Sequence, residues 1–543
     1  MDFKEEILKV LKKEIKEEIN LEIPPDPDLG DYAFPCFSLA KIYKKNPNQI
    51  ALELSMKIKA PFLEKVEAQG PYLNFFIARK LFCESVLKDI LKKDYFKKKN
   101  KGKILIEHTS INPNASPHVG RARNAIIGDS LKRLFDFLGY KVETHYYVND
   151  VSKQIAMMTL NCTGKEKFSD LLKKYREISK RIKENPDLEK DVFGILNKFE
   201  KGDKKISSKI KKIVNVAVEG QKKILSEFGI KFDYFDYESK YLKESGFVLN
   251  ELGKTGKLFL DKDGRRVLDQ RGTGLEKTMK NAVFVLTRSD GTGLYPLRDV
   301  AYTLYKLSKA EKNIIVLGED QKLYFMQLKE VLKILKKEAP DVVHYSFVLI
   351  QGADGPTKMS TRKGDVVLFE DLMKEAREKA KGEILERKTK GDPKIIGYGA
   401  VRYVIIKNDP NKNILFNMEE ALNFDGDTGP YLQYSYARAS SILRKSRKKP
   451  GQGFKIKDTE EAIKLIKKLS EFPCVVESAE KQLDPSLIAK FSFQLAQSFN
   501  EFYHKTTVIG SDQEEFLIAL TASFRDVLKE SLNILGIETL EEM

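Results

Sequence analysis

Short apolar runs alternate with longer amphipathic segments through the middle of the chain, from residue 104 to about residue 364. The apolar runs have the length of buried strands, and each lies near a segment whose apolar residues recur with helical spacing. They cover residues 104–106, 142–148, 284–286, 314–317 and 346–350. Such alternation is typical of an α/β domain with a doubly wound parallel sheet. In that architecture ligands bind at the carboxyl ends of the strands.

Different patterns flank this region. Residues 1–95 combine helices predicted over 3–19 and 48–58 with a Pro-rich turn and a strand over 66–77, which indicates a small α+β domain. After residue 365 the periodicity is mostly helical and predicts an all-α bundle, with helices over 371–386, 425–445, 459–483, 485–505 and 512–535. We therefore expect domains over 1–95, 103–365 and 366–543, a linker over 97–103, and a charged helical surface insertion over about 165–225.

Charge points to a polyanionic partner. The 543 residues include 96 Lys and Arg against 79 Asp and Glu, a net charge of +17 that favours nucleic acid, although a lysine-rich proteome would give a similar surplus. No run approaches the roughly 18 apolar residues that cross a membrane. The chain starts directly with a charged amphipathic helix, so we expect a cytoplasmic protein with no membrane partner.

Metal and common nucleotide motifs are missing from the sequence. The four cysteines are far apart and form no C-x-x-C pair, and the five histidines have no H-x-x-x-H spacing, so we expect neither structural zinc nor disulfides. There is no GxxxxGK[ST] loop and no GxGxxG fingerprint. Any nucleotide chemistry here must use another design.

Two short motifs carry candidate chemistry. Residues 116–121 (Ser-Pro-His-Val-Gly-Arg) begin a helix predicted over 119–138, which puts His118 where free backbone N–H groups and the helix dipole favour a phosphate. Residues 358–364 (Lys-Met-Ser-Thr-Arg-Lys-Gly) form a basic loop that could reach the same phosphates. Taken alone, each motif could also be structural, a capped helix or a solvated turn.

Together the two motifs resemble the HIGH and KMSKS signatures of class I aminoacyl-tRNA synthetases. Over nearly its full length the chain is similar to arginyl-tRNA synthetases of the archaeal type, through residues 107–114, 118–129, 295–301, 318–323, 399–403, 429–434 and 535–543. Residues 30–33 and 70–75 are similar to that family's additional amino-terminal domain. Two positions depart from the signatures, because Arg121 stands for the second His of HIGH and Thr361 for the second Lys of KMSKS.

The resemblance implies an activity and a domain plan. A Rossmann-like catalytic domain would bind nucleotide, the amino-terminal domain would bind tRNA, and the helical bundle would bind the anticodon. The implied reaction uses ATP with Mg²⁺ to activate L-arginine as arginyl-adenylate and then transfers arginine to the 3′ end of tRNA(Arg). Because no covalent enzyme intermediate is needed, positioning and electrostatic stabilisation of the phosphoryl oxygens carry the catalysis. We expect a monomer.

The resemblance also implies the site residues. The catalytic set is His118, Gly120, Arg121, Lys358, Arg362 and Lys363. ATP would be bound by His118, Val119, Gly120, Lys358, Met359 and Ser360. No residue is expected to bind a metal directly.

Arginine and tRNA contacts are implied in the same way. The arginine set is Glu107, Asn112, Tyr295, Asp299 and Gln321. Two carboxylates can neutralise the guanidinium and the α-ammonium group, and a fork of paired acceptors excludes lysine. The implied tRNA contacts are Tyr503 and Met543. From the residues alone, Asp299 could instead pair with Arg298, Tyr295 could be a core residue, and 499–503 could be a core stripe.

Other functions remain as alternatives. A class I synthetase for cysteine would need a thiol-selective metal site, and one for glutamate would need an arginine where Glu107 and Asp299 stand. A non-catalytic tRNA-binding paralogue would lose residues such as His118 and Lys358. A small-molecule nucleotidyltransferase would have no use for the carboxy-terminal helical region.

Overall fold

The computed structural model describes residues 3–26, 29–96, 100–279, 282–352, 355–358, 367–451 and 459–543. The chain folds into two compact units, each assembled from separate segments. One unit combines Met1–Lys97, Ala439–Pro473 and Gln494–Leu528, and the other combines Lys98–Arg438, Cys474–Phe493 and Lys529–Met543. Within the described residues, no helix combines the length and apolar character that crossing a bilayer requires.

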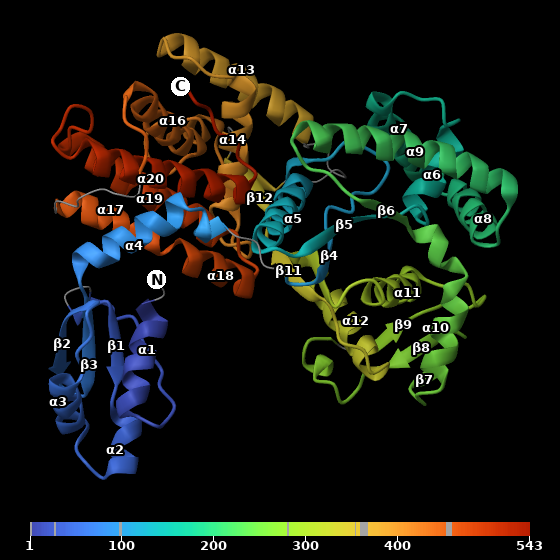
Figure 1. Ribbon diagram of the computed structural model, residues 1–543. Coiled ribbons are helices and arrows are strands. Elements are labelled where there is room, and N and C mark those ends of the chain that lie inside the picture. Colours follow the sequence, from blue (N-terminus) through green and yellow to red (C-terminus); the bar gives the residue numbers. More distant parts are fainter. Residues whose placement is uncertain are drawn as a thin grey trace. The chain divides into compact units, whose positions relative to one another are not determined.

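A parallel sheet of five strands forms the centre of the second unit (Figure 1). The strand order is β11-β10-β4-β5-β6, and every neighbouring pair is parallel. The strands are β4 (Lys103–Glu107), β5 (Lys141–Val148), β6 (Tyr234–Tyr237), β10 (Lys312–Gly318) and β11 (Asp341–Tyr345). The predicted fold class is confirmed: a parallel-sheet α/β domain with an amino-terminal α+β part and a carboxy-terminal helical part.

Helices cover both faces of this sheet. On one face, helix α5 (Val119–Leu138) packs Ile127 and Leu131 against Ile314 of β10 and its neighbours. The next residue of β10, Ile315, points to the other face and packs against α11 (Tyr295–Leu307) and α12 (Lys322–Ile334). Helix α5 has the predicted bounds because Gly139 takes a left-handed conformation (φ 94°) and ends it.

Two predicted strands belong to other sheets. The run 284–286 overlaps β9 (Val283–Val285), which forms an antiparallel sheet with β7 (Leu258–Leu260) and β8 (Arg266–Asp269). The run 346–350 overlaps β12 (Val348–Gly352), which pairs with β13 (Gly355–Lys358) and β14 (Ile414–Phe416). Their expected places in the parallel sheet are taken by β6 and β11. β6 and β11 are the two edge strands of this sheet, and edge strands tolerate polar residues. A search for apolar runs therefore missed them.

The predicted insertion over 165–225 is helical and clusters with the preceding helix (Figure 1). The preceding helix is α6 (Lys153–Asn161), and the helices of the insertion are α7 (Leu171–Glu184), α8 (Leu188–Glu200) and α9 (Lys204–Glu227). A small core joins α6, α7 and α9, formed in part by Met158, Leu171 and Ile213.

Residues close to position 536 belong to the second unit, which contains the parallel sheet. The remaining helices of that unit are α10 (Glu244–Gly253), α13 (Phe369–Glu386), α14 (Pro393–Ile406) and α15 (Met418–Ala421), and α18 (Phe472–Gln482) belongs to it from Cys474 onward. Arg402 of α14 is buried and bonds Oδ2 of Asp129 on α5 (2.9 Å) and the carbonyl oxygens of Phe228 (2.7 Å) and Leu535 (3.4 Å). Gly536 permits this packing, because a Cβ there would lie 2.2 Å from Nη1 of Arg402.

The other unit contains the amino-terminal domain. Its antiparallel sheet has the order β1-β3-β2, with β1 (Tyr32–Pro35), β2 (Leu63–Gln69) and β3 (Tyr72–Ile77). The strand predicted over 66–77 is therefore a hairpin, which turns at Gly70 (φ 57°). The accompanying helices are α1 (Phe3–Glu14), α2 (Phe37–Tyr43), α3 (Pro47–Lys57) and α4 (Arg79–Leu91).

The carboxy-terminal region is helical, as predicted. Helix α17 (Glu460–Ser470) lies in the first unit, while α16 (Gly429–Lys445), α19 (Ser486–Lys505) and α20 (Glu514–Leu535) run through both. The single helix predicted over 459–483 is two helices, α17 and α18. The break precedes Pro473, which has no N–H for a continuing helix.

Candidate active site

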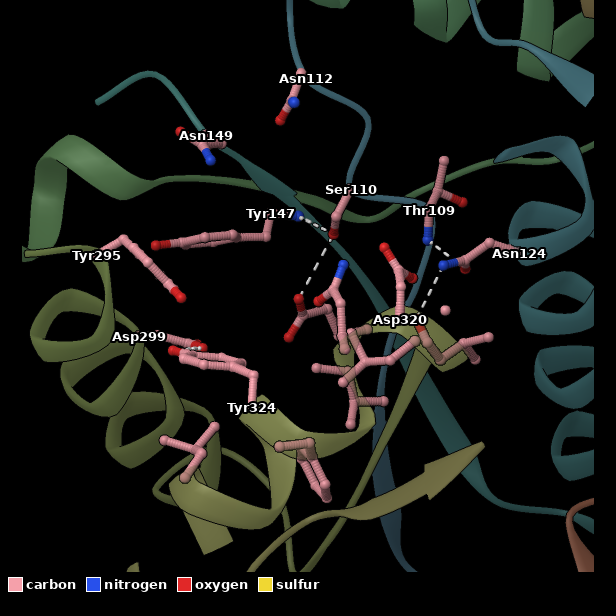
Figure 2. A pocket seen from close by; sticks show the side chains of 18 of the residues that line it. Thr109, Ser110, Asn112, Asn124, Tyr147, Asn149, Tyr295, Asp299, Asp320 and Tyr324 are labelled. Carbon is pink, nitrogen blue, oxygen red and sulfur yellow. Dashed lines mark hydrogen bonds between the residues drawn. The ribbon is translucent and has the colours of Figure 1, made fainter. Parts of the chain in front are cut away.

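A cavity of about 450 Å³ opens at the carboxyl ends of β4 and β10 (Figure 2). These strands are neighbours in the sheet, but the chain continues from β4 to β5 on the opposite side. The cavity therefore lies at the topological switch point, where open parallel sheets bind ligands.

All five residues of the predicted arginine set line this one cavity. Glu107 ends β4 and Asn112 follows it, while Tyr295 and Asp299 lie on the first turns of α11 and Gln321 directly precedes α12. Elements far apart in the sequence thus bring these side chains together. Which substrate atom each one contacts stays a prediction.

Asp299 and Tyr295 do not have the structural roles that the sequence left open. Oδ2 of Asp299 accepts a hydrogen bond from the hydroxyl of Tyr324 at 2.7 Å. Arg298 pairs instead with Glu238, through Nε and Oε1 at 2.6 Å. Tyr295 is 55% exposed, so it is not a core residue. Burial raises the pKa of Asp299, while the charge of Lys306 and the Tyr324 bond act in the opposite direction.

Glu107 is already paired inside the protein. Its Oε2 contacts the ammonium group of Lys306, and both residues are buried. Its Oε1 lies 3.5 Å from Oγ of Ser110. Burial raises the pKa of Glu107, and Lys306 opposes this rise.

Several cavity residues were missed by the sequence analysis. Tyr147 Oη, Asn149 Oδ1 and Glu238 Oε2 are buried without a hydrogen-bond partner among the described residues, and all three residues line the cavity. An unsatisfied buried polar atom costs about 1–3 kcal/mol, so such a cluster indicates a site that a ligand completes. Burial raises the pKa of Glu238 to about 7. The sequence did indicate Tyr147 and Asn149 as candidates, because Tyr147 lies near the carboxyl end of the predicted strand 142–148 and Asn149 directly follows it.

The loop after β4 has a strained backbone next to the cavity. Thr109 (φ 78°) and Ser110 (φ 42°) are consecutive non-glycine residues in the left-handed region. Asn124 of α5 holds this loop, since its Oδ1 accepts from the N–H of Thr109 (2.7 Å) and its Nδ2 donates to the carbonyl of Val316 (2.9 Å) (Figure 2). The ends of β4 and β10 are thereby fixed at the cavity.

His118 is the residue immediately before helix α5, as predicted, but its side chain does not cap the helix. Its Nδ1 is buried without a partner in the described chain. Burial, followed by the charge of Arg121, lowers the pKa of His118 to about 4, so the ring is neutral near pH 7. A Cβ on Gly120 would lie 3.1 Å from Cε1 of His118. Arg121 lines the cavity, whereas His118, Val119 and Gly120 do not.

The second signature falls mostly outside the described residues. The main chain of Lys358 ends strand β13. Met359, Ser360, Thr361, Arg362 and Lys363 lie beyond the part of the chain that the structure describes.

The two predicted tRNA contacts occur in different compact units. Tyr503 on α19 is 38% exposed, and its ring centroid lies 6.4 Å from that of Phe499. Phe499 and Phe502 are buried, and Phe499 stacks on Phe524 at 3.8 Å. Two members of the 499–503 stripe are therefore core residues. Met543 is partly exposed.

Known protein families cover most of the chain. Residues 84–418 match the family described as tRNA synthetases class I (R), catalytic domain. Residues 432–543 match the DALR anticodon binding domain, and residues 1–77 match the arginyl tRNA synthetase N terminal domain.

Individual relatives extend over the full length. The arginine–tRNA ligase of Methanocaldococcus jannaschii is 37% identical, with 99% of each chain covered. That of Halothermothrix orenii is 35% identical, with 100% of each chain covered. Among solved structures, the Thermus thermophilus arginyl-tRNA synthetase has a TM-score of 0.82 and 26% identity, with 99% of each chain covered. The Plasmodium falciparum enzyme has the same fold (TM-score 0.80, 22% identity, 100% of this chain and 98% of that one).

Proposed function

The chain belongs to the class I arginyl-tRNA synthetase family, and we propose that its cavity is where L-arginine reacts with ATP before transfer to tRNA(Arg). The chain is thus an arginine–tRNA ligase. The main support for placing the reaction in this cavity is that all five predicted arginine residues line it. The cavity also lies at the switch point of the sheet.

Arginine recognition uses the acidic part of the cavity. Asp299 supplies a carboxylate that no cation pairs with among the described residues, and Glu107 offers acceptor oxygens beside it. A guanidinium group gains roughly 1.5–3 kcal/mol from each charged hydrogen bond of this kind. Asn112, Tyr295 and Gln321 orient the rest of the amino acid.

ATP binds on the side where α5 begins. The neutral ring of His118 and the first backbone N–H groups of α5 hold phosphate oxygens, and Gly120 keeps the approach open. A carboxylate oxygen of arginine attacks the α-phosphorus, the bond to the bridging oxygen breaks, and pyrophosphate leaves. Lys358, Arg362 and Lys363, with Arg121 at the cavity, offset the charge that develops on pyrophosphate.

Mg²⁺ enters this site with ATP. Among the described residues, no group of three or more His, Cys, Asp or Glu side chains has metal-binding geometry. Such a chain fits a Mg²⁺ that takes its ligands mainly from phosphates and water, with one or two carboxylates. When bound, the ion neutralises phosphate charge.

The charge of the cavity bears on the alternatives. Its described lining includes four carboxylates, Glu107, Glu238, Asp299 and Asp320, and one guanidinium, Arg121. An acidic amino acid would be repelled there, which disfavours glutamate. A cysteine enzyme would attach cysteine to tRNA, and a non-catalytic paralogue would attach no amino acid. An aminoacylation assay therefore distinguishes both from the proposal.

The partners of the proposed enzyme are tRNA(Arg), L-arginine and ATP. The match to an anticodon-binding domain and the net charge of +17 support tRNA binding, for which Tyr503 and Met543 are the proposed contacts. We also propose that the protein acts in the cytoplasm as a monomer.

Aminoacylation of total tRNA with labelled arginine, lysine, cysteine and glutamate tests the proposal. Of the four amino acids, only arginine should be attached to tRNA. The Asp299→Asn variant should lose most of this arginine attachment. Incorporation of cysteine or glutamate, or of no amino acid, would reject the assignment.

A further inference from the structure

The ammonium group of Lys306 is buried behind the arginine cavity. Lys306 is 1% exposed and lies two turns after Asp299 on α11. Its Nζ contacts Oε2 of Glu107 and lies 4.4 Å from the centre of the Tyr302 ring. Lys306 does not line the cavity, so it meets bound arginine only through other residues.

A charge count shows what this lysine does for the site. Two buried glutamates that line the cavity each have a buried cation behind them, Lys306 for Glu107 and Arg298 for Glu238. Asp320 and Arg121, of opposite sign, also line it. Asp299 is left over, with a phenol hydroxyl as its hydrogen-bond partner. Counted with every carboxylate ionised, the surplus is one negative charge, which matches the single positive charge of arginine.

Without Lys306 this match would be lost. Glu107 and Asp299 would then face a single guanidinium with two charges, and a buried charge without a partner is strongly unfavourable. Glu107 would take up a proton, and a neutral carboxyl attracts a guanidinium less than a carboxylate does. Its O–H can donate to an oxygen of a neutral ligand but not to a guanidinium, which has no acceptor.

We propose that Lys306 is a positioning residue for amino acid selection: it holds Glu107 as an oriented carboxylate and sets the cavity charge so that arginine is preferred over its neutral analogue. This inference rests on the proposed binding of arginine in the cavity. Oε2 of Glu107 turns to Lys306, which directs Oε1 to the side of Ser110, a residue that lines the cavity.

Binding measurements with arginine and citrulline test the role directly. Citrulline has the length of arginine, but its neutral ureido group carries an oxygen that can accept from a protonated Glu107. In Lys306→Met, the dissociation constant of arginine should rise by about 30-fold, whereas that of citrulline should change by less than about 3-fold. Lys306→Arg should restore most of the preference. Equal losses for both ligands would show a merely structural lysine and overturn the proposal.

A double-variant cycle keeps the test decisive if Lys306→Met does not fold. Glu107→Gln and Glu107→Gln/Lys306→Met are compared, and the double variant lacks both buried charges. If Lys306 acts through Glu107 and through the cavity charge, adding Lys306→Met should not weaken arginine binding in this background, because it removes the cation that Glu107→Gln leaves unpaired. A further weakening of about 30-fold would mean that Lys306 acts independently of Glu107, which contradicts the proposal.

The controls separate this inference from the function on which it rests. Lys309→Met removes an exposed lysine just beyond the same helix, and it should leave both affinities unchanged. Binding is measured by equilibrium dialysis with tRNA(Arg) present. If the unmodified protein binds no arginine, the proposed function fails. If it binds arginine and Lys306→Met binds it equally well, only the inference about Lys306 fails.

Discussion

The hydroxyl of Tyr324, in the first turn of α12, donates a 2.7 Å hydrogen bond to the carboxylate of Asp299, one turn into α11, at the cavity. The bond uses one oxygen of Asp299 and fixes the plane of the carboxylate. Tyr324 in turn has Tyr295 beside it, with ring centroids 5.2 Å apart. The hydrogen-bond partner of the proposed counter-charge for arginine is therefore a neutral hydroxyl, which orients the carboxylate without forming an ion pair with it.

Asp299→Asn should remove that counter-charge while keeping the shape of the cavity. We expect a loss of about 2–4 kcal/mol of transition-state stabilisation, roughly a 30- to 1,000-fold fall in kcat/KM for arginine. The KM for ATP should change little. Steady-state aminoacylation with each substrate varied in turn measures both. Equal effects on arginine and ATP would contradict the assigned role.

Tyr324→Phe should produce a smaller defect that depends on pH. Losing one hydrogen bond costs about 1 kcal/mol, or about 5-fold in kcat/KM for arginine. Because the Tyr324 bond lowers the pKa of Asp299, its removal raises that pKa further. Arginine use requires the ionised carboxylate, so activity should decline at a higher pH in the variant as pH falls. Superimposable pH profiles would exclude this coupling.

His118→Ala should slow arginine activation by roughly 100-fold while preserving the fold. A side chain at a helix start contributes about 1 kcal/mol to stability, and this one makes no capping bond. Since its pKa is lowered to about 4, the wild-type ring stays neutral between pH 5 and 8 and should add no step to the activity profile there. Near-normal activity of the variant would return His118 to a structural role.

Asp129→Asn should destabilise the catalytic unit. Burial alone would raise the pKa of Asp129, but Arg402 and Arg133 hold it below its ordinary value. Its ionised form therefore stabilises the fold above the unfolded-state pKa of about 4, and this contribution disappears as pH falls through the lower folded-state pKa. We expect a loss of about 3–5 kcal/mol at pH 7.

Thermal unfolding of the Asp129 variant at several pH values measures this effect. The difference from the unmodified protein should stay constant from pH 8 to pH 5 and shrink below about pH 4. Asp136→Asn, on the same helix, breaks only a surface pair with Lys132 and should cost less than about 1 kcal/mol. A pH-independent loss at Asp129 would point to packing instead of charge.

Arginine activation should depend on tRNA. The resemblance to arginyl-tRNA synthetases implies that the amino acid is activated only with tRNA bound, so we expect no pyrophosphate exchange with arginine and ATP alone. Addition of tRNA(Arg) should start the exchange, because docking of tRNA biases the protein toward its competent state. Strong exchange without RNA would contradict this expectation.

How far the sequence leads depends on whether the signal is local. The bounds of α5 were predictable because His118 and Gly139 mark its two ends. The five arginine residues came from family resemblance, and no spacing along the chain could have shown that they share a cavity. The pairing of Lys306 with Glu107 joins residues 199 positions apart, and nothing near either residue announces it.

The edge strands of the parallel sheet were missed for a different reason, which lies in their own residues. β6 (Tyr-Phe-Asp-Tyr) and β11 (Asp-Val-Val-His-Tyr) contain charged or polar residues, because one side of an edge strand has no partner strand. A search for apolar runs therefore assigned 284–286 and 346–350 to the parallel sheet. The strands that overlap these two runs lie in smaller sheets. Tyr147 and Asn149 were accessible to sequence reasoning, since both lie at the carboxyl end of a predicted strand.

The packing of Gly536 on Arg402 has a consequence for how the enzyme is made. During synthesis, α5 and α14 leave the ribosome long before residue 535, so the buried guanidinium of Arg402 must wait for the backbone that finally covers it. The catalytic unit therefore cannot complete its folding segment by segment during translation. A nascent synthetase should therefore stay inactive, and exposed to chaperones, until translation has passed that glycine.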